Sequence, residues 1–107
     1  MIKVSILYPH KPDGHFDFAY YVNQHMPLSI SLLRAHPGFK SVSVERGLAS
    51  ADPQAELPYV AMCHFLFDAV DSFIAAFTPH AATLQGDMPN YTNIVPLIQF
   101  NEVLLSQ

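Results

Sequence analysis

Apolar and polar side chains alternate along several short segments of the chain, and this alternation predicts β-strands. Residues 2–8 and 41–45 show it most clearly. Successive side chains of a strand point to opposite faces, so the segment 41–45 is expected to have one face in water. Residues 59–67 are apolar on both faces, which predicts a central strand with a layer on each side. A last strand is predicted over residues 94–103.

Between these strands the apolar residues recur every three or four positions, which is the period of an α-helix. The first helix is expected to begin near Phe16, where Asp17 suits its N-terminus, and to end at residues 36–38. Its buried face would consist of Phe18, Tyr21, Val22, His25, Ser29 and Leu32. A second helix is predicted after Asp68, which can cap it, and a short third helix after the Thr-Pro pair at 78–79. The second helix would bury Val70, Phe73, Ile74 and Phe77.

Pro27 lies within the first predicted helix. A proline at this position lacks the N–H that would bind the carbonyl of Asn23, and its ring presses against that carbonyl. We therefore expect a kink beside His25, with a backbone acceptor left without its helical partner.

The predicted order is strand, helix, strand, strand, helix, strand, within one domain spanning residues 1–107. Two helices can cover only one face of a four-stranded antiparallel sheet. The other face would carry Leu7, residues of the third strand, and Val95 or Leu97. It would be an exposed apolar patch unless another subunit covered it. The pattern therefore indicates an α+β fold and a homodimer, in which two sheets pack through their open faces as a dimeric α+β barrel.

The composition narrows the classes of function. Half of the residues are apolar, 13% are charged and the formal net charge is −4. Because no basic cluster is present, nucleic-acid binding is not expected. The apolar runs are too short to span a bilayer, and the N-terminus lacks the layout of a signal peptide. Cys63 is the only cysteine, which excludes an intrachain disulfide, so we expect a cytoplasmic protein without membrane partners.

Three segments of the chain carry a resemblance to a known family. They are Met1–Ser5 leading to Tyr8-Pro9, Tyr20-Tyr21 followed by His25-Met26-Pro27-Leu28, and Pro79–Ala82 leading through Gly86-Asp87 to Pro89–Thr92. These segments resemble the EthD family, named for ethyl tert-butyl ether degradation, and the resemblance extends from Met1 to about Val103. It implies a ferredoxin-like βαββαβ monomer with helices on one face of the sheet, a dimeric α+β barrel, and an apolar cavity between sheet and helices.

The resemblance leaves several reactions open. Relatives with this architecture include cofactor-free monooxygenases, polyketide cyclases, muconolactone isomerases and haem-dependent enzymes. We expect a protein that binds a small apolar, oxygen-bearing organic ligand and acts on it by acid–base or oxidoreductase chemistry without a cofactor. Two alternatives stay open: a non-catalytic binding module that assists a partner oxygenase, and a haem-dependent oxidase or peroxidase.

His25 and His80 are the candidate catalytic residues. His25 falls on the buried face of the first helix, where it can act as a general acid or base in a cavity. The alternative is a buried neutral ring bound to the carbonyl freed by the kink. His80 follows Pro79 at the start of the short helix, where the helix dipole favours a neutral ring that can accept a proton. Its alternative is a surface residue.

Five further residues are candidates for binding the ligand: Tyr21, His64, Asp87, Asn90 and Tyr91. The loop that contains Asp87 can bring this carboxylate close to a histidine and orient it, while Asn90 and Tyr91 can offer hydrogen bonds to a ligand oxygen. Asn90 can equally stabilise the turn. His64, on the third strand, either faces the pocket or forms a hydrogen bond across strands, and Tyr21 either lines the pocket or packs in the core.

Metal and nucleotide sites are not indicated by the spacing of the residues. The six histidines include no pair at the i, i+4 spacing of a metalloprotease helix and no His-x-His strand pair. The four glycines are scattered and form no nucleotide-binding motif. Cys63 points away from the face of His64, so the two cannot pair directly, and a small buried side chain is the more frequent role for a lone cysteine.

Overall fold

The structure is a computed structural model that describes all residues from Met1 to Gln107. Its strands are β1 (Ile2–Pro9), β2 (Phe39–Arg46), β3 (Tyr59–Phe67) and β4 (Leu97–Glu102). The helices are α1 (Phe18–Tyr20), α2 (Met26–Leu33), α3 (Val70–Phe77) and α4 (Ala81–Gly86). A π-helical turn (Tyr21–His25) joins α1 to α2, and 3₁₀ turns (Thr78–His80 and Met88–Asn90) flank α4. None of these helices has the length and apolar character needed to cross a membrane.

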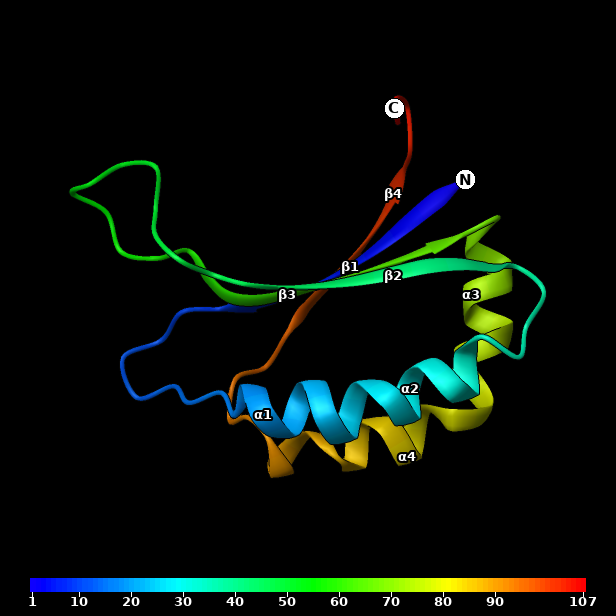
Figure 1. Cartoon of the computed structure of the whole chain (residues 1–107), viewed down its shortest axis with the longest axis horizontal. Helices are drawn as coiled ribbons and strands as arrows, with labels where there is room; N and C mark the ends of the chain where they lie inside the picture. The colour runs from blue at the N-terminus through cyan, green and yellow to red at the C-terminus, as the bar shows by residue number, and fades with distance from the viewer.

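The four strands form one antiparallel sheet in the order β2-β3-β1-β4, and all helices lie on one side of it (Figure 1). The α+β class, the antiparallel sheet and the central position of the strand at 59–67 are confirmed. The last strand begins three residues later than predicted, at Leu97. Pro96 precedes it and has no N–H to donate to a neighbouring strand, which explains the late start.

The core lies between the sheet and the helices. On β3, Ala61, Cys63, Phe65 and Phe67 face the helices and are fully buried. Most of the predicted helix positions point to the same core, but two predictions are wrong. Val22 is 51% exposed, and Ile74 is 47% exposed while Ala76 is buried in its place. Asp68 does not cap α3 either: Ala69 occupies the N-cap position and no side chain caps the helix.

The predicted disturbance near Pro27 takes the form of a π-helical turn. Asp17 caps the helix by accepting a hydrogen bond from the backbone N–H of Tyr20, at 3.0 Å. Further along, the N–H of Met26 binds the carbonyl of Tyr21, five residues back instead of four. The wider turn ends at His25, and Pro27 follows at the start of α2. Tyr21 and His25 are both buried by this arrangement, at 1% and 7% exposure.

The sheet face opposite the helices is more polar than expected. Ser5 binds the Nδ1 atom of His64 at 2.8 Å and the amide of Asn101 at 3.0 Å, and His64 Nε2 lies 3.4 Å from a carboxylate oxygen of Glu45. These four residues come from four different strands. Leu97, which pairs with Leu7 on this face, is exposed, as is Val95 before it. Ile98 and Phe100 are exposed on the helix side of β4, and Leu104 and Leu105 are exposed after it. Dimerisation through the open face stays a prediction.

Candidate functional site

An apolar cavity of about 320 Å³ lies between the sheet and the helices. Fourteen of its 18 lining residues are hydrophobic. The sheet contributes Tyr8 and Cys63, and the first helical run contributes Tyr21 and His25. Tyr91 reaches the cavity from the segment that follows α4. Concave, largely apolar sites with a few polar groups are typical of small-molecule binding.

Asp87 is the centre of the polar group beside this cavity. One of its carboxylate oxygens lies 2.9 Å from Nδ1 of His25. The other accepts hydrogen bonds from the hydroxyl of Tyr20 at 2.6 Å and from the side-chain amide of Asn90 at 2.9 Å. The predicted contact between Asp87 and a histidine is therefore present, and its histidine is His25. Because a carboxylate only accepts, this contact places the proton of a neutral His25 ring on Nδ1.

The second ring nitrogen of His25 has no partner within the protein. No buried polar side-chain atom of the chain lacks a hydrogen bond, so Nε2 is accessible to solvent. Two tyrosine rings pack against the His25 ring: Tyr21 is stacked at 5.5 Å between centroids, and Tyr91 is tilted at 4.6 Å. His25 lines the cavity, and Nε2 is its ring nitrogen without a partner in the protein.

The local electrostatics keep Asp87 ionised. Partial burial opposes ionisation, but the hydrogen bonds from Tyr20, Asn90 and His25 outweigh it and hold the pKa of the Asp87 carboxyl below its usual value. The hydrogen bond to Asp87, followed by desolvation, raises the pKa of Tyr20. Tyr20 therefore stays protonated and donates. An ionised carboxylate can orient a histidine and stabilise its protonated form.

A pair of tyrosine hydroxyls provides the other polar group of the cavity. The hydroxyls of Tyr8 and Tyr91 are 2.9 Å apart. Burial raises the pKa values of Tyr8, Tyr21 and Tyr91, so all three hydroxyls stay protonated. Each hydroxyl can donate one hydrogen bond, and in the Tyr8–Tyr91 pair only one of the two protons is used between them. The second proton is not used within this pair.

Two predicted site residues lie elsewhere. His80 is half-buried, does not line the cavity and makes no side-chain hydrogen bond, so the expected grouping of His25 with His80 is wrong. His64 lies on the opposite face of the sheet. There it forms a cross-strand hydrogen bond to Ser5, which was the predicted alternative to facing the pocket. The side chain of Cys63 lines the cavity, but burial raises the pKa of its thiol to about 12, which disfavours a thiolate nucleophile.

Tyr20 and Tyr8 take part in the site but were not among the predicted site residues. Tyr20 carries a usable signal, because it belongs to the Tyr20-Tyr21 pair that is part of the family resemblance. Tyr8 also belongs to a segment of the resemblance, but by its spacing near the end of a strand it could not be distinguished from a core residue. No group of three or more His, Cys, Asp or Glu side chains lies close enough together to hold a metal ion.

The sheet order and the helices on one face define a ferredoxin-like α+β protein. The model of the EthD domain matches residues 15–94, and the chain belongs to the EthD family. An EthD-like protein from Ralstonia eutropha JMP134 is 39% identical and has a TM-score of 0.91, with 99% of this chain and 94% of that chain covered. No curated protein matches the sequence significantly.

More distant structures show the same fold. An ethyl tert-butyl ether degradation (EthD) family protein from Bacillus halodurans C-125 is 24% identical, with a TM-score of 0.70 and coverage of 97% and 99% of the two chains. SnoaB, a cofactor-independent oxygenase from Streptomyces nogalater, is 14% identical, with a TM-score of 0.58 and coverage of 98% and 93%. At these levels of identity, the similarity to both structures shows a shared fold only.

Proposed function

We propose that the chain binds an apolar, oxygen-bearing organic compound in the cavity and that His25 transfers a proton to or from it without a cofactor. The observation that carries the proposal is the contact of 2.9 Å between Asp87 and Nδ1 of His25, beside a cavity lined mostly by hydrophobic residues. A histidine oriented by a carboxylate, with its other nitrogen open to a ligand, is suited to general acid–base catalysis.

The atoms that can contact a ligand determine the proposed chemistry. His25 Nε2 accepts a proton from an acidic O–H or from a C–H next to a carbonyl group, while the negative charge of Asp87 stabilises the imidazolium that forms. A hydroxyl of the Tyr8–Tyr91 pair donates to the oxygen on which the ligand's negative charge accumulates. The resulting anion can react with oxygen, isomerise or cyclise, and the first proton transfer is common to all three.

Two observations support a ligand of this class. The cavity has hydrophobic side chains on most of its wall, which favours an apolar body, and its few polar groups are neutral donors or His25. The fold is shared with SnoaB, which is described as a cofactor-independent oxygenase. Fold alone does not specify a reaction, so the assignment depends on the site.

Deuterium exchange tests the proton transfer independently of the later step. A panel of phenols and 1,3-dicarbonyl compounds is incubated in D₂O with the wild-type chain, His25→Gln, Asp87→Asn and His80→Gln, and exchange of carbon-bound hydrogens and product formation are followed by NMR and mass spectrometry. We expect catalysed exchange with the wild type and with His80→Gln, and a loss of roughly 100-fold or more with His25→Gln. Equal exchange by His25→Gln and His80→Gln would refute the proposal. Binding of the compound by the wild type without exchange or product would favour a non-catalytic binding module.

A further inference from the structure

A second hollow, of about 300 Å³, lies next to the cavity on the side of the loop before α1. Phe16 separates the two. Phe16 lines the hollow, whereas Tyr8, Tyr21 and Tyr91 line the cavity. The centre of the Phe16 ring lies 5.0 Å, 4.9 Å and 5.4 Å from the ring centres of these three tyrosines, respectively. The hollow shares no lining residue with the cavity. Its volume is at the lower end of the range for small-molecule sites.

The charges around this hollow differ from those of the chain as a whole. The chain has nine acidic residues and five Lys or Arg. The hollow is lined by Lys11, Arg46, His10 and His15 and by no acidic residue. Lys11 has an ion pair with Asp13 and His10 has one with Glu56, at 3.9 and 3.4 Å, but both carboxylates are more than four-fifths exposed. Such exposed pairs contribute little.

Arg46 is the cation without an acidic partner. It is the last residue of β2, and its guanidinium carbon lies 4.7 Å from the centre of the Phe18 ring. No carboxylate lies within ion-pair distance of it. A guanidinium held over the face of an aromatic ring keeps the N–H groups at its own edge free for a planar acceptor.

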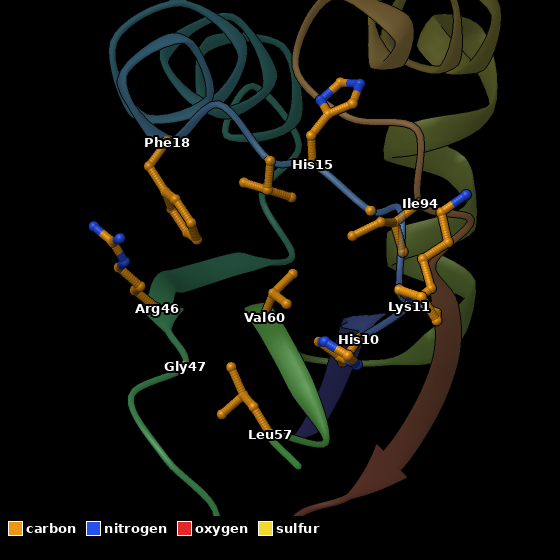
Figure 2. Close-up of a pocket in the computed structure, with 12 residues that line it drawn as sticks. His10, Lys11, His15, Phe18, Arg46, Gly47, Leu57, Val60 and Ile94 are labelled. Atoms are coloured by element: carbon orange, nitrogen blue, oxygen red, sulfur yellow. The ribbon is translucent and has the colours of Figure 1, made fainter.

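The apolar part of the hollow lies between its cations. Figure 2 shows Arg46 and Lys11 on opposite sides, with Phe18, Val60 and Ile94 between them and Leu57 below. A free inorganic anion would gain nothing from these apolar side chains. A carboxylate attached to an apolar or aromatic body would use both kinds of surface.

We propose that this hollow binds a small organic carboxylate, with its carboxylate group paired to Arg46 and its apolar body packed on Phe18, Val60 and Leu57. The planar fork of the guanidinium matches the two oxygens of a carboxylate, which gives a stronger interaction than a point charge does. This site is separate from the proposed proton transfer at His25 and does not depend on it.

Benzoate is the probe for the test, with benzamide as its neutral counterpart and inorganic phosphate as an anion without an apolar body. Each is titrated into ¹⁵N-labelled protein and followed by amide chemical shifts. We expect benzoate, and neither of the others, to shift amides in residues 10–18, 46–47 and 57–60 in a saturable manner. If benzamide bound as tightly as benzoate, the charge would play no part in binding. If phosphate bound as tightly as benzoate, the apolar surface would play no part.

Variants of Arg46 locate the site. Arg46→Gln is expected to weaken benzoate binding by up to about 5-fold, since Arg46 is exposed, an exposed ion pair contributes roughly 0.2–1 kcal/mol, and 1.4 kcal/mol corresponds to tenfold. Arg46→Lys keeps the charge without the fork and should give an intermediate affinity. Arg34→Gln, an exposed arginine at the end of α2, is the matched control and should bind as the wild type does. Unchanged affinity in both Arg46 variants, or a loss of binding in His25→Gln instead, would overturn the proposal.

Discussion

Replacing Asp87 by Asn tests whether one carboxylate organises the polar side of the cavity. The substitution keeps the shape of the side chain and removes its charge. In the native structure that charge accepts hydrogen bonds from Tyr20 at 2.6 Å, His25 at 2.9 Å and Asn90 at 2.9 Å. An Asn side chain has one acceptor oxygen, and its NH₂ group would face at least one donor. At least one of the three contacts is therefore lost.

The size of the effect follows from these contacts. A hydrogen bond to a charged group contributes roughly 1.5–3 kcal/mol, and a neutral acceptor retains part of that. The Asp87 side chain is 18% exposed, so water can replace some of what is lost. We expect Asp87→Asn to lower the free energy of unfolding by about 1–2 kcal/mol. For a chain of this size, such a loss corresponds to a decrease in Tm of roughly 4–15 °C.

Urea denaturation measures this loss, and Asp13→Asn is the matched control. Asp13 is 87% exposed and has a single ion pair at 3.9 Å, so its replacement should change stability little. A long-range ¹⁵N–¹H spectrum of the histidine rings adds a second readout. It should show the Nδ1–H tautomer of neutral His25 in the wild type and a mixture in Asp87→Asn. If Asp87→Asn were as stable as Asp13→Asn and kept the same tautomer, Asp87 would have no organising role.

Three further predictions concern pH, thiol reactivity and assembly. The pKa of Asp87 is lower in the folded chain than in the unfolded chain, so its stabilisation is complete above the unfolded value of about 4 and is lost as the pH falls through the folded value. Acid denaturation curves of the wild type and Asp87→Asn should therefore converge at low pH. Because the pKa of the Cys63 thiol is raised to about 12, Ellman's reagent should not react with the native chain at pH 8 and should react after unfolding. Light scattering should give the mass of two chains. If the open face forms the interface, replacing the exposed Leu97 by Asp should reduce the measured mass to that of one chain.

The strands could be predicted from the sequence because each pattern is local. Alternation over residues 2–8 and the doubly apolar segment 59–67 correspond to β1 and β3, which pair at the centre of the sheet. The exposure of Val22 could not be predicted. A regular helix places Val22 on the same stripe as Tyr21 and His25, but the π-helical turn adds a residue and changes the helical phase. Met26 is buried instead, at 4% exposure.

The members of the site could be predicted better than their partners. His25 was indicated by its place on an apolar face, and Asp87 by the loop that follows a short helix. Their contact joins residues 62 positions apart, and no spacing rule predicts such a pair. The helix-dipole argument made His80 a candidate base, and His80 is closer to Asp87 in sequence than His25 is. In the structure the loop lies against the first helical run instead, where Tyr20 adds the shortest of the three hydrogen bonds to Asp87.

Pro27 connects the local pattern with the site and gives a last prediction. A proline in the interior of a regular helix costs about 3 kcal/mol relative to alanine, from the missing N–H and the clash with the carbonyl four residues earlier. Here the turn before it is π-helical, and Met26 binds Tyr21, so the backbone around Asn23 does not have regular α-helical geometry. Pro27 then occupies the first turn of α2, where proline is tolerated.

Pro27→Ala should therefore stabilise the chain by less than about 1 kcal/mol, because the clash has already been relieved. The π-helical turn should persist in the variant, since the burial of Tyr21 and His25 and the bond from His25 to Asp87 hold it in place independently of the proline. Urea denaturation and protection of the Met26 amide from hydrogen exchange measure the two effects. A gain near 3 kcal/mol, with Met26 changing to a regular α-helical bond, would mean that the proline imposes the π turn. The orientation of His25 towards the cavity would then depend on Pro27 rather than on the packing around the ring.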